Sequence, residues 1–109
     1  MNLKSLLLGF CTLALVAGSL KAEARTYSYV NSPVSAAVLV AKDPHAHINL
    51  RAEPRPDAPL LGYGLVGDNI HLITYLFPGV DGKGWYLVQF DQSGAKGWIR
   101  ADFVDNFAE

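Results

Sequence analysis

Residues that interrupt regular structure recur every few positions between residues 36 and 104 of this 109-residue chain. All eight glycines beyond residue 24 fall between Gly62 and Gly97, and Pro54, Pro56 and Pro59 crowd one short stretch. Glycine and proline at this spacing leave room only for segments of a few residues. The chain is therefore divided too finely for long helices, and the pattern favours short strands joined by turns.

Six segments between these turns are short and rich in β-branched or aromatic residues, as strands are. They are residues 37–41, 48–51, 60–63, 69–75, 85–90 and 97–100. A period of two residues, typical of a half-buried strand, is clearest at Ile70, Leu72 and Thr74, and again at Tyr86, Val88 and Phe90. We expect an all-β fold, a small and partly open barrel of five to six short antiparallel strands.

The first 24 residues have the three parts of a secretory signal peptide. Lys4 supplies a positive start, residues 5–17 form an apolar run, and Ala22 and Ala24 give the small-x-small cleavage pattern. The run is shorter than the roughly 20 residues of a membrane-spanning helix. Bulky Phe10 before Cys11 argues against lipid attachment there. We expect cleavage near Ala24 and a secreted or periplasmic product, without cysteine and without membrane attachment.

The remaining chain has room for one domain only. Residues 25–35 are polar and without a sustained period, which predicts a linker or a loosely docked arm. Residues 36–105 form the expected domain, and residues 106–109 a C-terminal tail. Without residues 1–24 the chain keeps seven basic and nine acidic residues, a formal net charge of −2. This mixed charge lacks a basic footprint, so we expect no nucleic-acid partner.

Four motifs stand in order along this domain. They are Ile48-Asn49-Leu50-Arg51-Ala52-Glu53-Pro54, then Gly67-Asp68, then Gly84-Trp85-Tyr86-Leu87-Val88-Gln89-Phe90, then Gly97-Trp98-Ile99-Arg100-Ala101-Asp102-Phe103-Val104. The ordered set resembles the bacterial SH3-like (SH3b) domain family. The resemblance implies an SH3-like barrel, exported, that acts as a binding or targeting module at the cell envelope. In several relatives the ligand is peptidoglycan or its peptide cross-bridges. Relatives commonly have Ser-Gly where this chain has Ala52-Glu53.

The stretch from Gly62 to Gly67 matches the dinucleotide-binding pattern G-x-G-x-x-G. That motif requires a following helix whose N-terminus receives the pyrophosphate. Residues 68–74 alternate as a strand instead, so we interpret the glycines as a bend and expect no nucleotide cofactor.

Two histidines, His45 and His47, would share one face of an extended segment, with Asn49 and Arg51 continuing that face. This arrangement is a possible two-point grip on a metal ion. Zinc sites usually take three or four protein ligands, and His71 belongs to another predicted strand. We expect a solvated loop face and no metal.

Catalytic patterns are missing from the same sequence. Beyond residue 24 there is no cysteine and no G-x-S-x-G motif for a nucleophile. The acidic residues fall mostly in turns, where aspartate caps its own backbone. We therefore predict no catalytic residue and a protein that is not an enzyme.

The candidate ligand-binding residues are aromatic or charged: Tyr63, Trp85, Trp98, Arg51 and Glu53. Flat rings suit sugar rings and extended peptides, and the two tryptophans are either partly exposed or part of the core. Arg51, like Arg100, either binds a ligand carboxylate or forms an internal ion pair with Asp68, Asp102 or Glu53.

The leading hypothesis is an exported, non-enzymatic binding module with a shallow groove between the loops at residues 52–59 and 76–84. Its expected ligand is cell-wall peptidoglycan, through peptide or glycan. The alternative is a protein-interaction or regulatory subunit for an exported envelope protein, such as a cell-wall hydrolase. The oligomeric state does not follow from the sequence.

Overall fold

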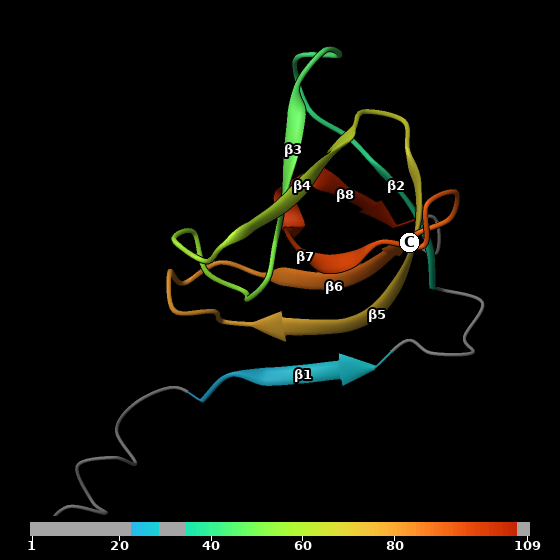
Figure 1. Cartoon of the computed structure of the whole chain (residues 1–109). Coiled ribbons are helices and arrows are strands. Elements are labelled where there is room, and N and C mark those ends of the chain that lie inside the picture. The colour runs from blue at the N-terminus through green and yellow to red at the C-terminus, as the bar shows by residue number, and fades with distance from the viewer. Residues whose placement is uncertain (1–22, 29–34, 107–109) are drawn as a thin grey trace, which may run out of the picture.

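The computed structural model describes residues 23–28 and 35–106, and it is all-β (Figure 1). Its elements are β1 (Arg25–Ser28), β2 (Ala36–Leu39), β3 (His47–Arg51), β4 (Leu60–Leu65), β5 (Asn69–Phe77), β6 (Trp85–Phe90), β7 (Lys96–Arg100), the short 3-10 helix η2 (Ala101–Phe103) and β8 (Val104–Asn106). Within the described part of the chain, no helix has the length and apolarity needed to cross a membrane.

The strands form one antiparallel sheet in the order β4-β3-β7-β6-β5-β2-β8, with β1 added on β5. The sheet curls because the turn after β4 reaches the end of β2. There the Gly67 N–H donates to the Leu39 carbonyl at 2.8 Å, and the Leu39 N–H donates to the Asp68 carbonyl at 3.0 Å. The curled sheet does not close, and β4 and β8 remain its two ends. The expected all-β, partly open fold is confirmed.

All six predicted strands exist, with ends that differ by no more than two residues. The expected number of five to six strands is too low, because β1 and β8 were not predicted. β8 was not predicted because η2 separates it from the apolar pattern of β7. β8 pairs with β2, where Val104 lies opposite Leu39.

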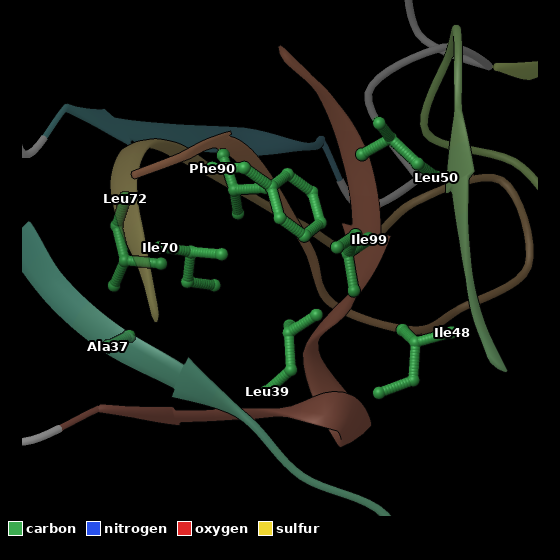
Figure 2. Close-up of a cluster of buried hydrophobic side chains, with 9 residues drawn as sticks. Ala37, Leu39, Ile48, Leu50, Ile70, Leu72, Phe90 and Ile99 are labelled. Atoms are coloured by element: carbon green, nitrogen blue, oxygen red, sulfur yellow. The ribbon is translucent and has the colours of Figure 1, made fainter. Parts of the chain in front are cut away.

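The core lies inside the curl and comes from alternate positions of the strands, as the two-residue period predicts. Its buried members are Ala37, Leu39, Ile48, Leu50, Ile70, Leu72, Val88, Phe90 and Ile99 (Figure 2). Full burial of each large apolar side chain contributes about 1.5–3 kcal/mol. The expected alternation breaks in β5, where a register shift between Leu72 and Thr74 leaves Thr74 only partly buried.

Strand β1 falls where the sequence predicted a linker or a docked arm. It runs antiparallel to the outer half of β5, with Tyr27 opposite Tyr75, and all four of its residues are exposed (Figure 1). A strand without a buried face needs no alternation of apolar and polar residues, so its sequence carries no signal by which β1 could be predicted. The predicted signal peptide at residues 1–24 lies almost wholly outside the described residues and stays a prediction.

Candidate functional site

A groove of about 260 Å³ lies beside the loop at residues 52–59, from which Pro56 lines it, whereas no residue of the predicted second wall at residues 76–84 does. We name it the arginine groove after the two guanidinium groups that line it. Its lining residues are His47, Ile48, Asn49, Arg51, Pro56, Trp85, Arg100 and Phe103.

Strand β3 places three polar side chains in this groove. Ile48 and Leu50 are buried in the core, so the alternate residues of the strand point to its other face. His47 and Asn49 are exposed on that face, and Arg51 is half-buried. The sequence pattern predicts the same three residues on one face, with His47 as part of a possible metal site and with Asn49 and Arg51 beside it.

The Arg51 guanidinium fixes the loop that forms one wall of the groove. Its Nη1 donates to the carbonyl of buried Ala58 at 3.0 Å. The Ala52 N–H donates to the Pro59 carbonyl at 2.9 Å and closes the base of the loop. Arg51 thus forms a loop-fixing contact, but with a backbone carbonyl and not with the acidic residues that the sequence suggested.

Arg100 does form one of the predicted internal ion pairs. Its Nη2 lies 2.7 Å from Oδ2 of Asp102. Its Nε atom is buried and has no hydrogen-bond partner. A guanidinium group carries five N–H donors, so one carboxylate does not saturate it. The groove consequently contains two fixed cations, one of them held by a neutral carbonyl.

Trp85 does not offer a free aromatic face, so the partial exposure considered for it is wrong. The residue is 2% exposed. Its indole N–H donates to Oδ1 of Asp81 at 3.0 Å, and a Cβ at Gly79 would come within 2.8 Å of its ring. The loop after β5 therefore covers the ring, which forms part of the groove wall.

Asp81 belongs to the same contact. Burial raises the pKa of this carboxyl group, but the Trp85 indole, the backbone N–H of Lys83 and the charge of Arg100 together outweigh that effect. The pKa of Asp81 lies below its usual value as a result. The group is a hydrogen-bonded anchor for the loop and is ionised at neutral pH.

The other three candidate residues are dispersed around the groove. Tyr63 is 56% exposed and stacks on His47, with ring centroids 4.0 Å apart and planes at 5°. Trp98 is half-buried opposite Arg51 in the β3–β7 pair and does not line the groove. Glu53 also lies off the lining and forms an ion pair with Arg55 at 2.7 Å. Arg51 and Trp85 are thus the predicted residues that the groove brings together, and Tyr63 joins them through His47.

The ion pairs of Arg55 hold the outer part of the loop at residues 52–59. The guanidinium also meets Asp57 at 2.8 Å. Hydrogen bonds with Asp57 and then Glu53 raise the pKa of Arg55, and the hydrogen bond from Arg55 lowers the pKa of Asp57. All three charges face solvent, where such pairs contribute little to stability.

The histidines of the possible metal grip have separate neighbours. His45 lies beside Asp43, His47 stacks on Tyr63, and Nδ1 of His71 lies 2.6 Å from Oδ1 of Asp91. Within residues 23–28 and 35–106, no three metal-binding side chains come together. Gly62 and Gly64 belong to β4, and β5, not a helix, follows Gly67.

A second groove, of about 480 Å³, flanks β4 and is here named the β4 groove. It runs between β4, the turn into β5 and the turn between β6 and β7. Its lining residues are Leu50, Leu61, Gly62, Tyr63, Leu65, Gly67, Asp68, Asn69, Phe90, Gln92, Ser93 and Ala95. Tyr63 connects the two sites, because it lines this groove and stacks on His47 of the other. Sequence reasoning found Tyr63 but not the apolar residues beside it.

Comparisons of the chain with protein-family models, with curated proteins and with solved structures find no match. The resemblance to bacterial SH3-like domains rests on the four sequence motifs and stays a prediction.

Proposed function

We propose that the protein is an exported, non-enzymatic binding module that recognises cell-wall peptidoglycan. The observation that carries the proposal is that Arg51 and Arg100 line one groove. The stem peptides of peptidoglycan carry carboxylates, and guanidinium groups bind carboxylates through paired hydrogen bonds. The motif resemblance and the predicted signal peptide agree with a ligand outside the cytoplasm.

The geometry of the groove suits such a ligand. The contacts of Arg51 with Ala58 and of Arg100 with Asp102 hold both guanidinium groups before any ligand arrives. Side chains that are already ordered lose less entropy on binding. The exposed Tyr63 ring, stacked on His47, adds a flat surface at the side of the groove where a sugar ring could pack.

Co-sedimentation of residues 25–109 with purified peptidoglycan sacculi tests the proposal. Asn49→Asp introduces a negative charge beside Arg51, whereas Gln92→Glu makes the same change of charge at the exposed turn between β6 and β7. We expect retention of the wild type and of Gln92→Glu, and a several-fold loss for Asn49→Asp. The retention should weaken as salt increases. Equal retention of both variants would contradict recognition through the arginine groove.

The non-enzymatic part of the proposal has its own test. Sacculi incubated with the purified protein should release no soluble fragments, as measured by chromatography of the supernatant. Sustained release that scales with protein concentration would contradict it.

A second candidate function is a protein-interaction or regulatory subunit for an exported envelope protein, such as a cell-wall hydrolase. The observation that favours it is the row of half-exposed apolar side chains on β4: Leu60, Leu61, Tyr63 and Leu65. Crosslinking in the intact envelope separates the two candidates. One crosslinked protein, together with no retention on sacculi, would favour this second function.

A further inference from the structure

Strand β4 has the apolar composition that is typical of a strand covered by another segment. It reads Leu-Leu-Gly-Tyr-Gly-Leu, without a charged residue or a proline. Soluble proteins usually protect an edge strand with charges, proline or a covering segment. Within the described residues, β4 stands at the end of the sheet and pairs only with β3. Its apolar side chains and its free edge are thus exposed together.

The peptide groups of β4 can be oriented from one local contact. The Leu65 N–H donates to Oδ2 of Asp68 at 2.9 Å, and the Leu65 carbonyl accepts from the Asp68 N–H at 3.0 Å. Both groups of Leu65 therefore point away from β3. Alternate residues of an antiparallel strand point their peptide groups the same way, so those of Tyr63 also face the free edge.

Space is available beside that edge. Gly62 lines the β4 groove, and a Cβ built on it would meet nothing within 4 Å. Glycine inside a strand often marks a place where another backbone or a ligand approaches closely. The groove beneath it reaches the core residues Leu50 and Phe90. An incoming strand would find both hydrogen-bonding groups and an apolar floor.

The exposed area indicates what kind of partner fits. The four apolar side chains of β4 are each about half exposed. Half of the surface of three leucines and one tyrosine is well below the roughly 800 Å² that each partner contributes to a standard interface between folded proteins. That is small for a stable dimer and appropriate for a single extended segment. Among the described residues that line the groove, Asp68 is the only acidic one and no basic residue accompanies it, which disfavours an acidic segment.

We propose that the free edge of β4 binds an extended segment of an exported partner polypeptide, which pairs with the main chain of Tyr63 as an additional strand. The segment has apolar side chains at alternate positions, which pack on Leu61 and Tyr63, and no acidic residue facing Asp68. Main-chain hydrogen bonds give such strand addition its affinity, and the alternate side chains give specificity. The proposal rests on the second of the two proposed functions, the protein-interaction subunit, and assigns the contact with its partner to the edge of β4.

The probe is a fluorescently labelled heptapeptide of alternating valine and threonine with a lysine at each end. Its comparison is the same peptide N-methylated at the five central positions, which removes main-chain donors and keeps the side chains. We expect saturable binding of the first peptide in fluorescence anisotropy and at least tenfold weaker binding of the second. The Tyr63 amide should exchange its hydrogen more slowly in the complex. Equal binding of the two peptides, or no binding of either, would overturn the proposal.

Two lysine variants test whether the peptide binds at β4. Leu61→Lys puts a charge at the edge, and Val80→Lys makes a similar change at an 81% exposed position of the loop after β5. We expect at least tenfold weaker peptide binding for Leu61→Lys and no change for Val80→Lys. Leu65→Lys serves in place of Leu61→Lys if circular dichroism shows that the latter is unfolded.

Two outcomes separate this proposal from the function on which it rests. A dimer of the purified protein that Leu61→Lys dissociates in analytical ultracentrifugation would assign the edge to a second copy and overturn the proposal. An exported protein that crosslinks equally to wild type and to Leu61→Lys would also overturn it, but would leave the interaction function standing.

Discussion

The indole N–H of Trp85 donates a hydrogen bond to Oδ1 of Asp81 at 3.0 Å. This contact ties the loop after β5 to the first residue of β6 and keeps the Trp85 ring out of solvent. Asp81 also accepts from the backbone N–H of Lys83 at 3.2 Å. One carboxylate therefore shapes the turn and holds the tryptophan that forms a wall of the arginine groove.

Replacement of Trp85 by phenylalanine tests that bond. Trp85→Phe keeps an aromatic ring but removes the donor, and leaves part of the ring volume empty. We expect a loss of about 1.5 kcal/mol from the bond to the charged acceptor, with an additional loss from the cavity. Urea unfolding followed by circular dichroism measures the sum. A stability equal to that of the wild type would contradict the anchoring role.

The pH dependence of stability should show the lowered pKa of Asp81. A carboxylate whose pKa is lower in the folded state stabilises the fold above its unfolded value of 3.8, and that contribution disappears as the pH falls through the folded pKa. Asp81→Asn cannot titrate. The stability difference between wild type and Asp81→Asn should be constant near neutral pH and should change as the pH falls from about 5 through the folded pKa. A change between pH 5 and 7 would assign the effect to another group.

Close packing of Gly97 against Leu50 predicts a specific rescue. A Cβ at Gly97 would lie 2.6 Å from Cγ of Leu50. Gly97→Ala should cost about 1–3 kcal/mol of stability through overpacking. In the double variant with Leu50→Ala the total loss should be smaller than the sum of the two single losses. Additive losses in urea unfolding would show that this contact does not cause the destabilisation.

Glu53 is expected to be dispensable. It pairs with Arg55 on the surface and lies outside the lining of the arginine groove. Glu53→Gln should change stability by less than about 0.5 kcal/mol and should leave sacculus retention at the wild-type level. Asn49→Asp provides the contrast in the same sedimentation assay. A clear loss of retention for Glu53→Gln would return this residue to the binding site.

Strand β1 should be removable. All four of its residues are exposed, and the core contains none of them. A chain that begins at residue 35 should fold cooperatively, with a modest decrease in the urea midpoint from the lost pairing with β5. The amides of Tyr75 and Phe77, which face β1, should then exchange faster. A truncated chain without a cooperative transition would show that β1 is part of the folding unit.

The sequence by itself determined the fold class and most of the core. Ile70, Leu72, Val88 and Phe90 are buried as their two-residue period predicts, because successive side chains of a strand face opposite sides of a sheet. Glycine and proline indicate the turns for an equally local reason. Proline restricts the backbone dihedral angles at its own position, and glycine widens their range. Such rules need no knowledge of distant residues.

Only the tertiary structure decided which candidate residues meet. Trp85 and Trp98 look alike in their motifs, but Gly79 and Asp81 of the preceding loop fold over the ring of Trp85. Arg100 comes beside Arg51 because β7 pairs with β3 across about 50 residues of sequence. Strand β1 pairs with β5 although its sequence has no apolar pattern. Strand β4 is an edge strand because of its place in the strand order of the sheet. The burial of a side chain, the pairing of a strand and the position of a strand at the edge of the sheet all depend on which segments lie next to it. That arrangement is set by the tertiary structure.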